Sequence, residues 1–567
     1  MKTQRQRRSG LALALLAGAL GGCGNDADTE SRGLLDAEGT SEPWLVQYLV
    51  PGGDFLGIHG LTFDHDDNLY VGSVIGQAIY QVDTRTGESS VFVGPPEGMA
   101  DDLEFGPDGT LVWTSILTGK VHARDPDGSI RVLADNLPGI NSVAFDNDGR
   151  LFVTQVLWGD ALWELDLAGQ REPRRVIADQ GHLNGFDFDR EGKLYGPLLY
   201  KGKVVKVDVD SGELETVASG LRIPVAVNLD RRDNLYVPDT ALGRILRVDI
   251  DSGEKTLVAT VREGIDNLAL NSRDELYITN MVDNAVLRIN TATGAARAIT
   301  SSPLAVPGGL AVAQENGVDQ VYLGDLFSFK KIDGKSGAVT ELKRGLRDRM
   351  EMPMTVNLRG GRATTSSWFT NAVEVIDLAG NRSVATYHEL RHPVDALELE
   401  PGVVLVAEQG SGTLLRISGE DREVIAEDLP GMAALRALPP KDAEDPVRHV
   451  YLTDAVQGEL LRIDVKDGSS RVVVDGLQQP EGFDLLPEGG IVLAEVGRQR
   501  LVHIDPASGE VTEIARNLAI GYPAAEGTPP SYVQTGVAVS PAGAIYVSAD
   551  RSTALYKIVP QQPGGGH

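Results

Sequence analysis

The sequence predicts an all-β fold of tandem β-propellers, and three observations support this prediction. The chain repeats itself about every 40 residues, each repeat holds four strand-like segments, and helical periodicity is scarce. Two first halves of repeats are GIHGLTFDHDDNLYVGS (57–73) and GIDNLALNSRDELYITN (264–280). Alternating apolar and polar residues on either side of a short polar turn indicate a β-hairpin. A third strand such as AIYQVD, a Gly turn and a more variable fourth strand complete each repeat.

The last apolar residue of the first strand marks each repeat. The twelve markers are Phe63, Phe105, Phe145, Phe188, Leu229, Leu270, Val312, Leu358, Leu399, Leu438, Leu485 and Val539. The first six intervals are 42, 40, 43, 41, 41 and 42 residues. Because a propeller usually has about four to eight blades, twelve repeats predict two six-bladed propellers. We expect the first at residues 44–307 and the second at 308–560.

The two ends of the repeat region are expected to meet. The last repeat stops after its third strand, Tyr556–Val559, whereas residues 44–50 (WLVQYLV) form a strand that no repeat claims. We expect residues 44–50 to supply the closing fourth strand of the last blade, because closure removes an exposed sheet edge.

The N-terminus has the pattern of a secretion signal. Basic residues precede an apolar run (LALALLA, 11–17), and the segment is short for a membrane span. The run Leu20–Cys23 resembles the bacterial lipobox, which predicts a signal peptide at 1–22 and a lipid on Cys23; an ordinary cleaved signal is the alternative. Residues 23–43 are expected to be a flexible tether and 561–567 a tail. Cys23 is the only cysteine, so no intramolecular disulfide is possible. We therefore expect a protein of the bacterial cell envelope, periplasmic or on the outer surface, that meets the membrane only through its lipid.

The amino-acid composition limits the classes of binding partner that we expect. The chain has 81 acidic and 52 basic residues, a formal charge of −29, which argues against nucleic acid and suits a soluble surface or a cation binder. Hydrophobic residues make up 42% and charged residues 23%, as in a globular protein. We expect a monomer that takes a small-molecule substrate or a protein or glycan ligand.

Candidate site residues follow from the repeat. In a propeller the inner strand of each blade begins at one mouth of the central channel, so the residues four positions before the markers should form a ring there. The first ring is His59, Asp101, Asn141, Asn184, Val225 and Asp266. The second ring is Gly308, Met354, Asp395, Ala434, Glu481 and Thr535. Five of the first six are polar against three of the second, which places the expected chemistry in the first propeller.

The polar members of the first ring suit a hard cation. Two carboxylates and two amide oxygens, with water, are what Ca²⁺ prefers. We therefore expect a divalent cation, Ca²⁺ above others, held by Asp101, Asn141, Asn184 and Asp266. A water-filled polar channel without metal is the alternative.

A family resemblance supports this expectation. The segments NSVAF (141–145) and NGFDF (184–188) resemble the senescence marker protein/gluconolactonase/regucalcin family, and Asp266-Asn267 is similar to the Asp-Asn pair of paraoxonases. The resemblance implies six-bladed propellers that hold a divalent metal, usually Ca²⁺, in the channel and hydrolyse lactones or organophosphates. Other segments, such as Pro238-Asp239-Thr240, resemble NHL repeats, which are mostly binding scaffolds.

This chain departs from the family pattern in two blades. The family has Glu in the first blade and Asp in the fifth, where this sequence has His59 and Val225. A direct transfer of catalytic roles therefore fails. The expected function is a metal-dependent hydrolase of lactone-type small molecules, with Asp266 or His59 as general base. The alternatives are a non-enzymatic envelope scaffold that binds protein or glycan, and a lyase like the streptogramin lyases, for which His182 beside Asn184 is the only hint.

One further motif carries no function. His388–His392 reads H-E-x-x-H, which binds zinc when both His lie on one helical face. Pro393 follows directly, and the repeat places the segment in a connection between strands, so we expect no zinc site.

Overall fold

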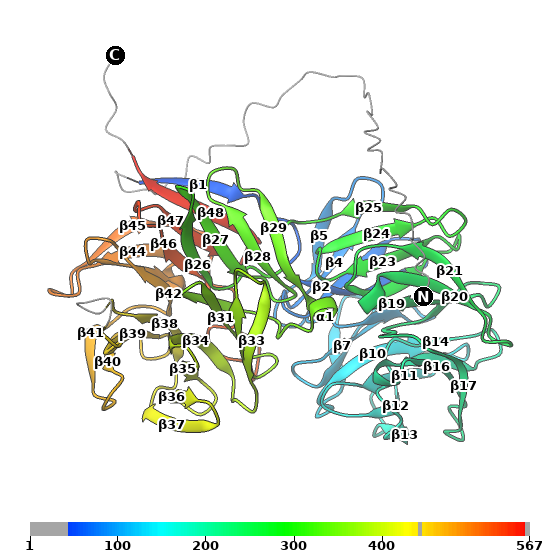
Figure 1. The fold of residues 1–567 in the computed structure, drawn as a ribbon. Coiled ribbons are helices and arrows are strands. Elements are labelled where there is room, and N and C mark those ends of the chain that lie inside the picture. Colours follow the sequence, from blue (N-terminus) through cyan, green and yellow to red (C-terminus); the bar gives the residue numbers. More distant parts are fainter. Residues whose placement is uncertain (1–43, 440–444, 562–567) are drawn as a thin grey trace, which may run out of the picture. The chain divides into compact units, whose positions relative to one another are not determined.

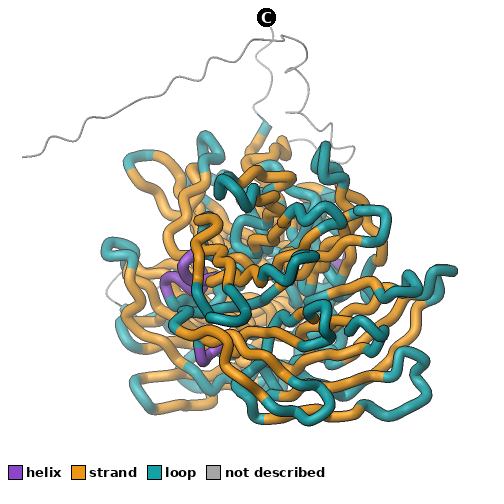
Figure 2. Tube along the Cα trace, turned by 90° about the vertical axis from the view of Figure 1, so that its right-hand side faces the viewer, coloured by secondary structure: helices purple, strands orange, loops and turns teal. Residues whose placement is uncertain are grey.

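The computed structural model describes residues 44–439 and 445–561. They form twelve four-stranded antiparallel sheets, numbered here as blades 1–12 in chain order (Figures 1 and 2). Strands and turns dominate, and the described helices are the single turns α1 (Gly345–Asp348), η1 (Leu199–Lys201), η2 (Thr240–Leu242) and η3 (Val496–Arg498). No helix in these ranges is long and apolar enough to cross a membrane. The predicted signal peptide, Cys23, the tether up to residue 43 and the tail from 562 lie outside the described residues.

The first propeller holds blades 1–6, which share one strand order. From the inner to the outer strand, the blades are β2 (Ile58–Phe63), β3 (Leu69–Ser73), β4 (Ala78–Val82), β5 (Ser89–Val93); β6 (Leu103–Phe105), β7 (Leu111–Ser115), β8 (Lys120–Arg124), β9 (Ile130–Ala134); β10 (Ile140–Phe145), β11 (Leu151–Gln155), β12 (Ala161–Leu165), β13 (Arg174–Ala178); β14 (Asp187–Phe188), β15 (Leu194–Leu198), β16 (Lys203–Val207), β17 (Leu214–Ser219); β18 (Asn228–Leu229), β19 (Leu235–Asp239), β20 (Arg244–Val248), β21 (Lys255–Thr260); and β22 (Ile265–Leu270), β23 (Leu276–Asn280), β24 (Ala285–Ile289), β25 (Ala296–Thr300).

The second propeller holds blades 7–12. In the same order, its blades are β26 (Leu310–Glu315), β27 (Val318–Gly324), β28 (Ser328–Asp333), β29 (Val339–Arg344); β30 (Thr355–Arg359), β31 (Arg362–Ser367), β32 (Ala372–Asp377), β33 (Arg382–Tyr387); β34 (Pro393–Glu400), β35 (Val403–Glu408), β36 (Thr413–Ser418), β37 (Asp421–Ala426); β38 (Met432–Ala437), β39 (His449–Asp454), β40 (Glu459–Asp464), β41 (Ser470–Val474); β42 (Pro480–Leu485), β43 (Ile491–Glu495), β44 (Arg500–Ile504), β45 (Val511–Ala515); and β46 (Val537–Val539), β47 (Ile545–Ala549), β48 (Ala554–Pro560), β1 (Trp44–Val50).

The inner strands close into two separate rings. In the first, β2, β6, β10, β14, β18 and β22 contact one another in this order, and β22 returns to β2. In the second, β26, β30, β34, β38, β42 and β46 do the same, and β46 returns to β26. The predicted pair of six-bladed propellers is therefore confirmed.

The N-terminal strand closes the last blade. β1 pairs antiparallel with β48, from Trp44 opposite Pro560 to Val50 opposite Leu555, and Figure 1 shows the blue and red strands side by side. Trp44 and Val46 pack against the core between blades 11 and 12. The strand thus covers an exposed edge and also contributes apolar contacts.

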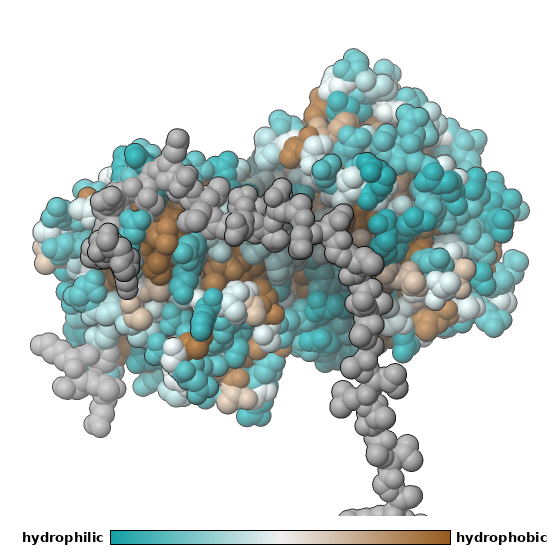
Figure 3. Space-filling view, turned by 90° about the horizontal axis from the view of Figure 1, so that it is seen from above, coloured by the Kyte–Doolittle hydropathy of each residue, from teal (hydrophilic) through white to brown (hydrophobic). Residues whose placement is uncertain are grey.

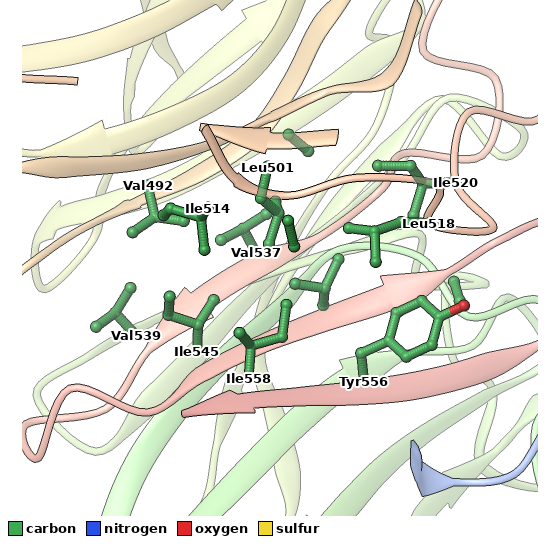
Figure 4. Packing of buried hydrophobic residues seen from close by; sticks show 14 of the residues in the cluster. Val492, Leu501, Ile514, Leu518, Ile520, Val537, Val539, Ile545, Tyr556 and Ile558 are labelled. Carbon is green, nitrogen blue, oxygen red and sulfur yellow. The ribbon is translucent and has the colours of Figure 1, made fainter. Parts of the chain in front are cut away.

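The core lies between neighbouring blades. Between blades 11 and 12, Val492 and Leu501 pack with Val537 and Ile545 (Figure 4). Fully burying one such side chain contributes about 1.5–3 kcal/mol. The second strands of the first propeller are buried along their whole length, as in LYVGS and LFVTQ, because blades cover both of their faces. Some outermost strands, such as β17 and β21, are largely exposed, and the face in Figure 3 is mostly hydrophilic.

The two propellers share a buried apolar cluster. It joins Val74, Ile75 and Met281 of the first propeller to Phe327 and Trp368 of the second. The inserted segment before β46 adds polar contacts: the Tyr522 hydroxyl donates to the carbonyl of Gly76, and the Gln77 side chain donates to the carbonyl of Pro523 at 2.8 Å. These contacts join blade 12 to blade 1.

Candidate functional site

Local irregularities in strand pairing set the direction of the ring side chains in the first propeller. In five blades the ring residue directly follows a residue that pairs with the end of the second strand; these pairs are Ile58–Ser73, Ile140–Gln155, Leu183–Leu198, Pro224–Asp239 and Ile265–Asn280. After Ile58, Ile140 and Ile265 the register shifts before pairing resumes. Such a bulge leaves a residue outside the ladder and redirects its side chain. His59, Asn141 and Asp266 occupy these bulges.

Asp101 is placed by a related backbone contact. Its N–H donates to the carbonyl of Thr114 at 2.9 Å, before β6 begins. The N–H groups of Asn184 and Val225 donate in the same way to Pro197 and Pro238, at 3.0 and 3.3 Å. Each of these acceptors is the last residue but one of the second strand.

All six ring residues line one cavity of about 210 Å³. It is somewhat smaller than the usual ligand pocket of about 300–1,000 Å³. The candidates that the sequence places in the first ring, His59, Asp101, Asn141, Asn184 and Asp266, therefore share a single chamber. Val225 is the apolar member of the ring.

His59 lies between the two carboxylates. Its Nδ1 is 3.4 Å from Asp266 Oδ2 and 3.7 Å from Asp101 Oδ1. The exposed fractions of the side chains are 13% for His59, 12% for Asp101 and 24% for Asp266. The three groups thus form a compact cluster that is largely screened from water.

Burial and mutual charge perturb this cluster. Burial lowers the pKa of His59, but the hydrogen bond to Asp266 and the charges of Asp266 and Asp101 outweigh it and raise the pKa above its ordinary value. Burial raises the pKa of Asp101 to about 8, with the neighbouring carboxylates adding to the shift and His59 opposing it. Groups with such perturbed pKa values gather at functional sites.

The two amide side chains meet at one hydroxyl. Ser142 Oγ lies 2.9 Å from Asn141 Oδ1 and 3.2 Å from Asn184 Oδ1, and Ser142 is 1% exposed. The amide oxygens of Asn141 and Asn184 are therefore close together. They lie in the same cavity as the two carboxylates.

The donor set agrees with a hard cation by its chemistry. Asp101, Asn141, Asn184 and Asp266 offer only oxygen ligands, as Ca²⁺ prefers. Across the described ranges, no group of three or more His, Cys, Asp and Glu side chains is arranged to hold a metal ion.

A second layer of polar contacts supports the ring. Asp102 accepts hydrogen bonds from Asn267 Nδ2 at 2.9 Å and from the N–H of Val143 at 3.2 Å. Burial raises the pKa of Asp102 to about 7. Asn267 Oδ1 accepts from the N–H of Leu268 at 2.8 Å. These contacts tie blades 2, 3 and 6 together behind the ring.

Farther along the same inner strands lies a second cavity of about 200 Å³. Asp102, Glu104 and Asp187 line it. Burial raises the pKa of Asp187 to about 6 and that of Glu104 well above its usual range. The channel of the first propeller is thus acidic over much of its length.

The side chain of Arg436 crosses the corresponding channel of the second propeller. Arg436 Nη1 donates to Asn357 Oδ1 at 2.9 Å and to Asp395 Oδ2 at 3.4 Å. Its Nη2 donates to the carbonyls of Leu310 and Val537, both at 3.4 Å. The guanidinium therefore ties inner strands across the channel. This role was not predicted, because Arg436 stands two residues after the ring position.

An apolar collar surrounds the polar ring, and sequence reasoning missed it. The residues directly after the second strands line the cavity: Val74, Ile75, Ile116, Val156, Leu157, Leu199, Tyr200 and Met281. Leu326, Phe327, Leu346, Met352 and Phe369 of the second propeller complete the lining. The recurrent apolar residue at an expected loop was the signal available in the sequence.

His182 belongs to neighbouring structure rather than to this chamber. Its Nδ1 lies 2.8 Å from the carbonyl of Val156, and its ring centroid lies 5.0 Å from that of Tyr200. Asp160 accepts from its backbone N–H at 3.0 Å. Among the described side chains that line the cavity, His182 is absent. The H-E-x-x-H motif lies in the connection between β33 and β34, as expected, without a helix.

Comparisons with known proteins found similar solved structures and one matching family. By structure, the chain is similar to virginiamycin B lyase from Staphylococcus aureus, with 14% identity, 49% of this chain and 95% of that chain covered, and a TM-score of 0.36. A streptogramin B lyase matches with 15% identity, 50% and 94% coverage and a TM-score of 0.38. A gluconolactonase from Xanthomonas campestris matches with 15% identity, 43% and 89% coverage and a TM-score of 0.36. No curated protein sequence matches.

The sequence model of one family covers most of the first ring. Residues 50–229 match the SMP-30/Gluconolactonase/LRE-like region. This range includes His59, Asp101, Asn141 and Asn184 but ends before Asp266. Over residues 50–229, the resemblance to the gluconolactonase-like family is therefore confirmed.

Proposed function

We propose that this protein hydrolyses lactone-type small molecules in the cavity at the mouth of the first propeller. The observation that carries the proposal is the position of His59 Nδ1 between the carboxylates of Asp266 and Asp101, at 3.4 and 3.7 Å, in a largely buried chamber. The match of residues 50–229 to the gluconolactonase-like family supports this reaction class. In the reaction, water adds to the ester carbonyl, the acyl–oxygen bond breaks, and a hydroxy acid leaves.

His59 is the proposed general base. Its Nδ1 faces Asp266, so the hydrogen on Nδ1 is donated to that carboxylate, and Nε2 remains to accept a proton from water. The same Nε2–H then returns the proton to the alkoxide that leaves the carbonyl carbon. Asp266 orients the imidazole and stabilises its charge while it carries this proton.

A divalent cation, Ca²⁺ above others, belongs to the proposal. Asp101, Asn141, Asn184 and Asp266 would hold it with their oxygens. When bound, such a cation polarises the ester carbonyl. The chain's own residues orient the substrate and move the proton.

The proposed cellular location rests on the N-terminal signal in the sequence. We place the protein in the bacterial cell envelope, anchored through a lipid on Cys23 and acting as a monomer. The alternative is an envelope scaffold that binds protein or glycan without turnover. The partly exposed Leu157 and Tyr200 at the cavity mouth, 40% and 64% exposed, support ligand binding of some kind.

A lactone panel with one variant and one matched control tests the proposal. We expect H59Q to lower kcat/KM at least 100-fold, since a general base contributes about 10²–10⁴-fold. The control is E481Q, which alters a buried carboxyl of the second ring, outside this cavity. Turnover that survives H59Q, or that falls equally in E481Q, would move the reaction away from this cavity.

A further inference from the structure

We propose that the second propeller supplies the apolar wall of this cavity and thereby selects lactones that carry an apolar substituent. This inference rests on the proposed hydrolase function. It deepens that function by naming the substrate class.

The cavity has two chemically distinct sides. The ring residues form a polar floor, with His59 and both carboxylates at its centre. Apart from the ring, its neighbours Ser142 and Asn267, and Gly185, the side chains that line the cavity are aliphatic, thioether or aromatic, and only Tyr200 among them carries a hydroxyl. A ligand whose ester meets the floor must therefore place the rest of its structure against apolar groups.

The wall from the second propeller is held in place. Phe327 is 5% exposed, and its ring centroid lies 5.7 Å from that of His59 in an edge-to-face arrangement. The preceding Asp325 is fully buried, accepts from the N–H groups of Ala305 and Val306, and pairs with Lys330. The wall is thus fixed before a ligand arrives, which reduces the ordering cost of binding.

The open side of the cavity is also apolar. Leu157 and Tyr200 line the cavity and remain 40% and 64% exposed, so solvent reaches it beside blades 3 and 4. Phe369 of the second propeller lines the same cavity, and its ring centroid lies 6.3 Å from that of Trp158. A substituent on the lactone ring therefore meets hydrocarbon from the floor to the opening.

The physical consequence is discrimination between lactones. Each methylene that is buried against this wall should raise kcat/KM about fourfold, from the free energy of burying a CH₂ group. A sugar lactone would instead bury hydroxyl groups against side chains that, apart from Tyr200, cannot pair with them, which is costly. The wall therefore favours alkyl lactones and rejects polyhydroxylated ones.

The test compares lactones and wall variants in the full chain. The substrates are γ-butyrolactone, γ-octalactone and glucono-δ-lactone, and the variants are F369A and M352Q. We expect γ-octalactone to have at least tenfold higher kcat/KM than the other two, and either variant to lower this preference at least fivefold. The control is V456S, which alters an exposed apolar residue after the second strand of blade 10, outside the cavity.

Binding separates this inference from the proposed function. γ-Octalactam and 2-pyrrolidinone, which resist hydrolysis, are titrated by calorimetry into the same proteins. Tighter binding of γ-octalactam that F369A weakens supports the apolar wall even if no lactone is hydrolysed. Hydrolysis without any preference for the alkyl lactone, or with a preference for glucono-δ-lactone, would overturn the inference and leave the hydrolase function standing. Equal binding of both lactams by all variants would also overturn it.

Discussion

His59 Nδ1 lies 3.4 Å from Asp266 Oδ2, although the two residues belong to the first and the sixth blade of the first propeller. The contact exists because β22 returns to β2 and closes the ring of inner strands. It differs from a contact within one hairpin, since 207 residues separate the two side chains in the sequence (266 − 59). The proposed base and its orienting carboxylate are thus a product of ring closure.

Replacing the orienting carboxylate should slow turnover. In D266N the imidazole loses the charge that orients it and stabilises its protonated form, so we expect kcat to fall about 100-fold. Steady-state kinetics on a lactone measures this. The control is D274N, at the turn of the same hairpin, where Asp274 pairs with Arg231 at 3.1 Å. An equal loss in both variants would indicate a general effect on the blade rather than a role for Asp266.

The proposed cation should be measurable without turnover. Elemental analysis of protein dialysed in Ca²⁺ is expected to find about one equivalent, since four oxygen ligands with water make a Ca²⁺ site. Because a ligand that binds only the folded state stabilises it, chelation should lower the melting temperature.

Variants of the two proposed amide ligands test the position of the cation, and a third Asn serves as the control. N141A and N184A should each lose most of the bound cation. N147A, an exposed Asn in the turn of the same blade as Asn141, should keep it. Protein that carries no divalent cation and does not respond to chelation would remove the metal from the mechanism while leaving His59 as the base.

The period of the repeats was enough to predict the two propellers and the closing strand. The period also located the six ring residues, because the inner strand of each blade begins about four positions before the marker. The directions of the His59 and Asp266 side chains depend on backbone bulges. The spacing of residues in the sequence does not reveal where such bulges occur.

Contacts between repeats were harder to predict. The repeats of both propellers look alike, so their period does not say that Phe327 and Phe369 line the cavity of the first propeller. Likewise, Arg436 reaches across the channel of the second propeller because its side chain is long. The ring position of the same blade holds Ala434. Such long-range packing depends on how surfaces meet in space, which periodicity does not encode.

Arg344 should be important for joining the propellers. This residue of β29 is 1% exposed and donates to Asp283 at 2.9 and 2.7 Å and to the carbonyl of Glu263 at 2.8 Å, both in the first propeller. Removing one partner of a buried ion pair costs about 3–5 kcal/mol. The lower end applies here, because Asp283 is 21% exposed and keeps a second partner in Arg262 at 2.6 Å. We expect R344M to lower the free energy of unfolding by about 3 kcal/mol in guanidinium denaturation.

The control for this prediction lies three residues away. Arg347 is 41% exposed and pairs with Asp348 at 2.8 Å. Because exposed pairs contribute about 0–1 kcal/mol, R347M should shift the unfolding midpoint far less. Equal midpoints for the two variants would show that Arg344 does not stabilise the interface.

His122 should make stability depend on pH in the mildly acidic range. It is 8% exposed, its ring stacks on Trp113 with centroids 5.3 Å apart, and its Nδ1 lies 3.1 Å from Ser115 Oγ. Burial, with a smaller effect from the charge of Lys120, lowers the pKa of His122 to about 4. In the unfolded chain a histidine has a pKa of about 6.5.

The direction of the effect follows from these two values. Between pH 6.5 and about 4 the unfolded chain binds a proton that the folded protein excludes, so the contribution is present above pH 6.5 and is lost as the pH falls toward 4. The loss amounts to roughly 3 kcal/mol. H122F keeps an aromatic ring on Trp113 but cannot titrate, so its free energy of unfolding should fall less than that of the unaltered protein between pH 7 and pH 4. H65Q, at an exposed turn, serves as the control. Parallel pH profiles for H122F and the unaltered protein would contradict this role, because then the folded and unfolded states would bind the proton of His122 equally well.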